Sequence, residues 1–184
     1  MIRFFDILFS LLGLIFGLPI FLVVFVVGYL DTGSPVFLQR RVGRYKKAFT
    51  LIKFRTMKKD TASVASHQVN ASAVTKVGKV LRRTKLDEIP QLINVLLGQM
   101  SLVGPRPCLP SQEELISARE ALGVHKSRPG ITGVAQLNNI DMSTPQLLAE
   151  TDAAMIKNMN LKVYFRCILL TAIGKGGGDR VLIK

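Results

Sequence analysis

Two adjacent carboxylates, Asp87 and Glu88, are the residues of this chain best suited to chemistry, because they interrupt its most basic stretch. Residues 32–86 contain fourteen Lys and Arg but a single acid, Asp60. Such a field favours ionised carboxylates and attracts phosphate. An ionised carboxylate can attack phosphorus, while its neighbour holds a cation or a proton. Both residues also suit a helix N-terminus, where Asp is a favoured cap. The sequence leaves the two interpretations open.

Candidate phosphate-binding cations lie in two proline-containing loops and near the carboxylates. Prolines on both sides of Arg106 fix the backbone and so present one guanidinium at low ordering cost. Arg128 opens the segment RPGITG at residues 128–133, whose glycine amides can approach a phosphate closely. The remaining candidates are Lys53, Arg55 and Arg82. An alternative role for all these cations is attraction to anionic lipid headgroups. No loop has Walker-A spacing, which excludes a P-loop nucleotide site.

A membrane element precedes these residues. Of the 24 residues from 7 to 30, 18 are Leu, Ile, Val or Phe and none is charged, so this run belongs in lipid. Pro19 near its midpoint predicts a kink or break. Each arm then reaches roughly 18 Å, enough to enter one leaflet and return but not to cross a hydrocarbon core about 30 Å thick. The residues alone fit both a re-entrant hairpin and a single spanning helix.

Periodicity predicts an α/β fold that is mostly helical, with a small strand element. We expect a strand at residues 48–54 and helices at 76–83, at 89–97 ending at Gly98, from 111 to about 123, from Pro145, and at 161–173. Residues 111–114 have the pattern of a capping box. Within the helices, Val77, Val80 and Leu81 should face inward, as should the apolar series from Ile89 to Leu97. The last helix is amphipathic and suits either the membrane interface or the core.

Composition supports one catalytic domain plus an anchor. The chain has 184 residues, a net charge of +13 and a pI of about 10.2, which argues for an anionic partner. We expect residues 1–30 to form the membrane element and residues 31–184 a cytoplasmic, membrane-associated domain. The basic residues that follow the apolar run place that domain on the cytoplasmic side. The isolated cysteines and histidines predict neither disulfides nor zinc.

Four ordered motifs give the chain a family resemblance. They are KFRTM at 53–57, LDEIPQLINV at 86–95, MSLVGPRP at 100–107 and RPGITG at 128–133. In these the chain closely resembles the bacterial sugar transferases known as monotopic phosphoglycosyl transferases. The four motifs span nearly the whole chain, and the chain has a length similar to that of the family's minimal catalytic core.

The resemblance implies transfer of a sugar 1-phosphate from a UDP-sugar to undecaprenyl phosphate at the cytoplasmic face of the bacterial inner membrane. UMP would be released, and downstream glycosyltransferases would extend the product into a surface glycan. The family mechanism is ping-pong, with Asp87 as nucleophile and Glu88 assisting Mg²⁺ binding or deprotonating the lipid phosphate. Arg82, Arg106 and Arg128 would bind phosphates.

The resemblance also bears on the anchor and the late helix. Family members have a re-entrant helix broken at a Ser-Pro pair, which here reads Leu18-Pro19. We therefore expect re-entry, with the break at Pro19. Asp152 matches an acidic position of the family's late helix, and we assign neither it nor Gln99 a definite role.

Two other classes of function compete with this one. A noncatalytic anchored protein could bind nucleic acid or acidic lipid through its basic stretch, with affinity that falls steeply with salt. No RNA-binding or helix-turn-helix motif supports it, so we expect no nucleic-acid partner. A metal-dependent membrane phosphohydrolase would instead use the carboxylates for Mg²⁺ and water as acceptor.

Overall fold

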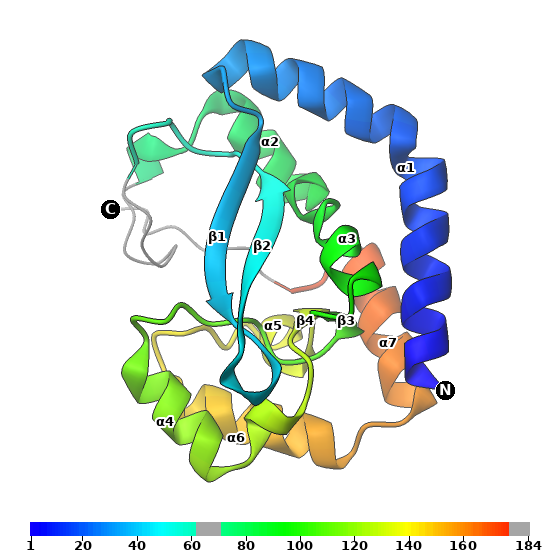
Figure 1. Cartoon of the computed structure of the whole chain (residues 1–184), viewed down its shortest axis with the longest axis vertical. Coiled ribbons are helices and arrows are strands. Elements are labelled where there is room, and N and C mark those ends of the chain that lie inside the picture. The colour runs from blue at the N-terminus through cyan, green and yellow to red at the C-terminus, as the bar shows by residue number, and fades with distance from the viewer. Residues whose placement is uncertain (62–70, 177–184) are drawn as a thin grey trace.

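Helices dominate the part of the chain that the computed structural model describes, residues 1–61 and 71–176 (Figure 1). The α-helices are α1 (Ile2–Thr32), α2 (Lys76–Thr84), α3 (Gln91–Leu96), α4 (Glu113–Ala121), α5 (Val134–Leu137), α6 (Pro145–Lys157) and α7 (Leu161–Ala172). Short 3₁₀ helices are η1 (Arg44–Lys46), η3 (Ala71–Ala73), η4 (Leu86–Glu88) and η5 (Val124–Lys126). The strands are β1 (Val36–Val42), β2 (Ala48–Phe54), β3 (Ser101–Val103) and β4 (Gly130–Thr132). The predicted mostly helical α/β class is confirmed.

The strands form two small sheets. β1 and β2 make an antiparallel hairpin in which Val36 pairs with Phe54 and Val42 with Ala48. β3 and β4 are parallel, with Ser101 opposite Gly130. The loop after β3 turns back across the start of β4, where the Gly130 amide donates to the Pro105 carbonyl at 2.8 Å. This contact brings together the two segments that the sequence marks as phosphate-binding, Gly104-Pro105-Arg106 and Arg128-Pro129.

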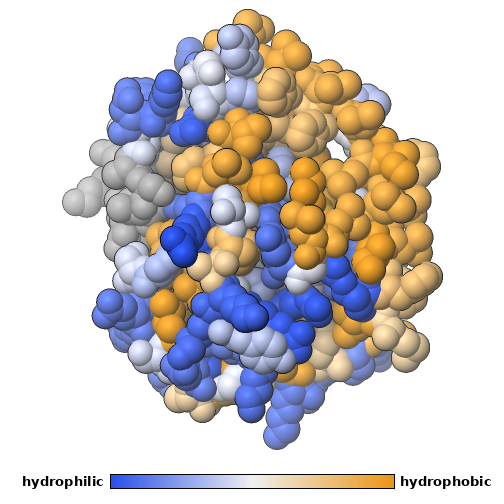
Figure 2. Space-filling view, in the orientation of Figure 1, coloured by the Kyte–Doolittle hydropathy of each residue, from blue (hydrophilic) through white to orange (hydrophobic). Residues whose placement is uncertain are grey.

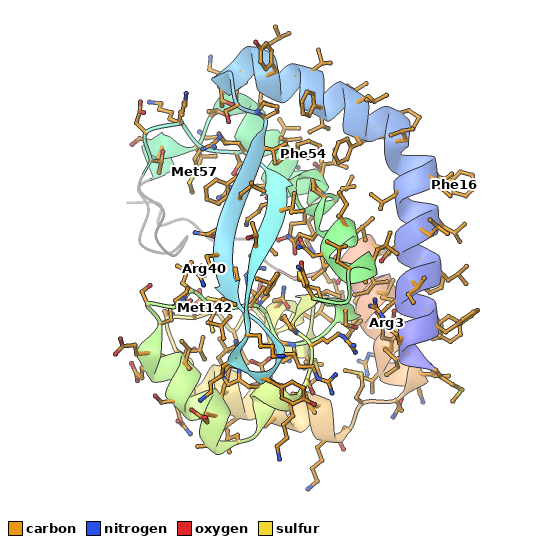
Figure 3. All side chains as sticks on the ribbon, in the orientation of Figure 1. Arg3, Phe16, Arg40, Phe54, Met57 and Met142 are labelled. Carbon is orange, nitrogen blue, oxygen red and sulfur yellow. The ribbon has the colours of Figure 1, made fainter. Side chains whose placement is uncertain are left out.

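The long helix α1 bends at its middle. Figure 1 shows two arms that meet at an angle, and Figure 3 places Phe16 at the bend. Pro19 lies inside the helix, where a proline removes one hydrogen bond and displaces the preceding turn. The predicted disruption is therefore a bend within one helix and not a break between two. By length and composition α1 can cross a membrane, and Figure 2 shows its apolar side chains covering the upper and right edges of the molecule.

The two arms of α1 pack on different parts of the domain. The first arm contacts α3, β3 and the cluster around Tyr164 through Ile2, Phe5 and Phe9. A Cβ on Gly13 would lie 2.9 Å from Leu92 Cδ1, so the first arm and α3 approach closely. The second arm packs on α2 and β2, where the rings of Phe21 and Phe54 are 4.8 Å apart. The bend thus seats α1 on both helices that flank η4.

Most predicted elements are present, and one detail of α4 is wrong. The strand at 48–54 and the helices that begin at Lys76, Pro145 and Leu161 are confirmed. α4 is also present, but its N-cap is Gln112 without a side-chain cap, so the predicted capping box is wrong. Gln112 instead accepts a hydrogen bond from the Leu109 amide.

The predicted inward faces are partly wrong. Val80 of α2 is 60% exposed, and Leu97 after α3 is 65% exposed. The buried side chains of α3 are Gln91, Asn94 and Val95. α3 contacts α1 as well as the core, with Leu92 close to Gly13, so its apolar periodicity arises from both contacts.

Candidate active site

The carboxylate pair lies in η4, the turn that joins α2 to α3. Lys85 adopts a left-handed conformation with φ 58° and ends α2, so the chain reverses before Asp87. The N-cap of α3 is Pro90, not Asp87, which removes the capping interpretation for that helix. Asp87 is only 4% exposed. Its placement therefore needs an explanation other than helix capping.

Glu88 faces Arg106, the arginine predicted in the third motif. Its Oε1 lies 3.6 Å from Arg106 Nη2, and both side chains are mostly buried. Lys85 is close to both, and burial lowers its pKa, with Glu88 opposing and Arg106 reinforcing that effect. These three residues line a small cavity of about 10 Å³ together with Thr132, Gln136 and Lys175. A space of that size holds a water or an ion, between groups of opposite charge.

Two buried arginines fix the backbone around Arg106. Arg119 of α4 donates from Nη1 to the Arg106 carbonyl at 2.8 Å, and Arg41 of β1 donates from Nη1 to the Pro107 carbonyl at 3.0 Å. Asp152 of α6 in turn accepts two hydrogen bonds from Arg119, at 2.6 and 3.0 Å. Asp152 thus reaches the site indirectly, as the partner of the residue that holds the Arg106 loop.

Glycines allow the two predicted phosphate loops to cross. A Cβ at Gly130 would lie 2.1 Å from the Gly104 nitrogen, and one at Gly104 would lie 2.5 Å from the Arg128 carbonyl oxygen. Neither position admits a side chain without moving the backbone. The close crossing explains the paired Gly-containing motifs, and it places Arg106 and Arg128 on two adjoining loops.

The other predicted cations, Lys53, Arg55 and Arg82, lie in two different parts of the structure. Arg82, in the last turn of α2, donates from Nε to Thr56 Oγ1 at 2.8 Å. Lys53 is 6% exposed on β2, a strand that packs against η4. Arg55 donates to the Ser34 carbonyl at 2.9 Å and lies over the Phe37 ring. The structure therefore groups Lys53 and Arg82 with the carboxylate turn, while the contacts of Arg55 are at the connection between α1 and β1.

Arg128 lies in a different cavity from Glu88 and Arg106. It lines a larger space of about 260 Å³ with Arg3, Arg44 and Lys126. The three predicted phosphate-binding arginines, Arg82, Arg106 and Arg128, are thus divided among separate surroundings. Sequence motifs alone cannot show this division, because it depends on which side of the β3–β4 crossing each side chain occupies.

The donor set of the turn fits Mg²⁺. Mg²⁺ is usually held by one or two carboxylates, with waters and substrate phosphates completing its shell. Asp87 and Glu88 supply two neighbouring carboxylates, and no cluster of three or more His, Cys, Asp or Glu exists among residues 1–61 and 71–176. The described part of the chain therefore suits a cation shared with substrate better than a metal enclosed by protein.

Several supporting residues carry no sequence signal of their own. Asn94 is fully buried, accepts from the Ile52 amide at 3.0 Å and donates to the Thr50 carbonyl at 2.8 Å. It thereby joins α3 to β2 beside the turn. Asp6 of α1 is 2% exposed and accepts hydrogen bonds from Ser101, Leu102 and Tyr164. A buried polar group with partners far along the chain is visible only once the fold is known.

Comparison with known proteins gives consistent matches over most of the chain. A family model described as "Bacterial sugar transferase" matches residues 1–175. The "uncharacterized sugar transferase EpsL" of Bacillus subtilis is 36% identical over 170 residues, which cover 92% of this chain and 84% of that protein. The "UDP-glucose:undecaprenyl-phosphate glucose-1-phosphate transferase" of Caulobacter vibrioides is 37% identical over 80% of this chain and 57% of its own length. A Klebsiella pneumoniae protein of the same name is 39% identical over 90% of this chain and 38% of its own.

Proposed function

Because the chain belongs to the bacterial sugar transferase family, we propose that it transfers a sugar 1-phosphate from a UDP-sugar to undecaprenyl phosphate and releases UMP. The names of the Caulobacter and Klebsiella relatives describe this reaction with glucose as the sugar. The observation that carries the proposal is the turn η4, which holds a buried Asp87 beside a Glu88–Arg106 ion pair.

In the first step Asp87 attacks the donor. A carboxylate oxygen forms a bond to the β-phosphorus of the UDP-sugar, and the bond between that phosphorus and the bridging oxygen breaks. UMP leaves with the bridging oxygen, and the sugar phosphate remains on Asp87 as an acyl phosphate. Arg106, fixed by Arg119 at its carbonyl, stabilises charge on the phosphoryl oxygens without reorganisation at the moment of reaction.

In the second step the lipid phosphate takes over the phosphosugar. An oxygen of undecaprenyl phosphate attacks the phosphorus, the acyl phosphate bond breaks, and Asp87 is restored as a carboxylate. Glu88 accepts the proton of the lipid phosphate when that group arrives protonated. Both steps are nucleophilic displacements at phosphorus and involve no change in oxidation state.

Mg²⁺ and the membrane complete the proposal. Asp87 and Glu88 would hold Mg²⁺, which neutralises diphosphate charge when it is bound. We place the protein at the bacterial inner membrane with its catalytic domain on the cytoplasmic face. α1 supports the membrane location, because it is the helix of the described residues that is long and apolar enough for a membrane.

The nucleophile assignment is tested by Asp87→Asn in the detergent-solubilised protein. We expect UMP release from UDP-sugars with polyprenyl phosphate to fall at least about a thousandfold, because the attacking oxyanion is lost. UDP-glucose is the first donor to test. Asp60→Asn is the matched control, since Asp60 is an exposed acid in the same basic stretch, and it should leave turnover unchanged. Retained turnover in Asp87→Asn would refute the assignment.

The covalent intermediate is tested separately with sugar-labelled donor and no lipid acceptor. We expect labelled protein, followed by transfer of the label to lipid when acceptor is added. A fully active preparation that never carries label would favour direct transfer. Free sugar phosphate as the main product would instead identify a phosphohydrolase.

A further inference from the structure

A second cationic cavity lies at the base of α1. It has a volume of about 260 Å³ and is lined by residues of α1, η1, η5 and the loops on either side of the β3–β4 crossing. Its charged residues are Arg3, Asp6, Arg44, Lys126 and Arg128. We call it the basal cavity. Pro105 lines the basal cavity, and the next residue, Arg106, lines the Glu88–Arg106 cavity. The two cavities share no lining residue.

Two guanidinium groups of the basal cavity are held in place by protein carbonyls. Arg44 donates from Nε to the Lys126 carbonyl at 2.8 Å, and Arg128 donates from Nε to the Gly98 carbonyl at 2.9 Å. Within the described residues, their Nη groups and Lys126 Nζ have no hydrogen-bond acceptor. A guanidinium fixed through Nε loses little freedom when its Nη edge binds an oxyanion.

The single acid of the basal cavity does not neutralise these three cations. Asp6 Oδ1 accepts hydrogen bonds from Ser101, Leu102 and Tyr164 at 2.9 Å each. Its Oδ2 lies 3.8 Å from Arg3 Nη1. Asp6 and Arg3 therefore compensate one another, and the basal cavity keeps an excess of three positive charges, which favours an anionic ligand.

Apolar surface continues from the basal cavity along α1. Ile2, Ile156 and Met159 form part of its wall. On the same turns of α1 as Arg3 and Asp6, Phe4 is 64% exposed and Ile7 is 44% exposed. Figure 3 shows Arg3 extending from α1 toward the domain, and Figure 2 shows hydrophilic residues of the lower half meeting the apolar edge formed by α1. A ligand with an oxyanion at one end and a hydrocarbon chain at the other matches this boundary.

We propose that the basal cavity binds the phosphate headgroup of a membrane phospholipid, whose hydrocarbon chains lie along the first arm of α1. A lipid is favoured over a nucleotide because no aromatic side chain lines the cavity to stack on a base. The site would fix the depth at which the catalytic domain sits in the interface. The inference depends on α1 lying in the membrane, and not on the reaction at Asp87.

The test compares two double variants that remove the same charge. Arg44→Gln/Lys126→Gln removes two cations of the basal cavity, whereas Lys47→Gln/Lys157→Gln removes two exposed lysines that line none of the cavities described above. Calorimetric titration of the detergent-solubilised full chain with dihexanoyl phosphatidylglycerol should show saturable binding. We expect at least tenfold weaker binding in the first variant and less than twofold change in the second.

Further arms separate the sources of phosphate. Inorganic phosphate and UDP are titrated into the same proteins, and Lys126→Glu is included as a single surface change in case the double variant folds poorly. We expect Lys126→Glu to weaken phosphatidylglycerol binding as well. Equal weakening in the two double variants would overturn the proposal, as would inorganic phosphate binding as tightly as the lipid. A loss of UDP affinity larger than the loss of lipid affinity would reassign the basal cavity to the donor.

Discussion

Asp87 and Glu88 are neighbours in the chain, yet η4 gives their carboxylates different surroundings. Asp87 is buried in the turn, while Glu88 points to Arg106 and shares a small cavity with Lys85. Different environments are how two identical groups acquire different tasks in one site. The division fits an attacking carboxylate at 87 and a group that handles a proton or a cation at 88.

Asp152 should affect turnover through Arg106. Asp152→Asn leaves Arg119 buried without its counter-charge, and breaking a buried pair in this way costs about 3–5 kcal/mol. We expect lower thermal stability and slower UMP release, because the Arg106 carbonyl loses a fixed donor. In an Arg106→Ala background the same change should slow turnover little further. Glu150→Gln is the control on the exposed face of α6, and additive effects of Asp152→Asn and Arg106→Ala would contradict the coupling.

At the scale of elements, local patterns predicted some parts well and missed others for physical reasons. The alternation of Phe49 and Leu51 predicted β2, because one face of that strand is buried. Its partner β1 was not predicted, since Leu38 is 59% exposed while Gln39 and Arg41 are buried. This inverted pattern arises because β1 turns polar side chains toward the Arg106 loop, where Arg41 binds the Pro107 carbonyl. The nearby parallel pairing of β3 and β4 involves three residues each, too few for any periodic signal.

The short helix η5 should make stability depend on pH. Burial lowers the pKa of His125, and its Nε2 lies 3.3 Å from the Ile116 carbonyl oxygen. Because the folded state disfavours the protonated ring, the unfolded state binds more protons at acidic pH. Stability is therefore intact above the ordinary His pKa of about 6.5 and is lost as pH falls through the lower folded value.

Chemical denaturation at pH 7.5 and pH 5.5 measures this effect. The loss of unfolding free energy between the two conditions should be larger for wild type than for His125→Gln, which cannot take up the proton. An identical loss in the two proteins would show that His125 does not contribute.

At the scale of the whole molecule, α1 determines how the domain meets the membrane. Its arms bend around the helices on either side of η4, and exposed apolar side chains cover the outer surface of the bend. The amphipathic helix α7 exposes Leu169, and Ile173 directly after it is also exposed. α7 packs on the first arm of α1 through contacts of Phe165 with Phe5 and Phe9. Proline-induced bending and this shared apolar surface favour a hairpin that enters and leaves one leaflet.

Labelling from one side of sealed vesicles tests that topology. Ile2→Cys and Arg40→Cys are made singly, with the two buried native cysteines replaced by alanine, and treated with a membrane-impermeant maleimide. We expect both positions to react from the same side. Reaction from opposite sides would show that α1 spans the bilayer.

The seating of α1 also makes the anchor an internal part of the enzyme. Deleting it would uncover Tyr164, Leu81 and Phe54 together and would leave Ser101 and Leu102 without the carboxylate of Asp6. A fragment beginning near residue 34 would thus lose the helix that covers part of its core as well as its membrane anchor. Conversely, a change in bilayer thickness that alters the angle at Pro19 would act on α2 and α3 together, so lipid composition would change the position of η4 between them.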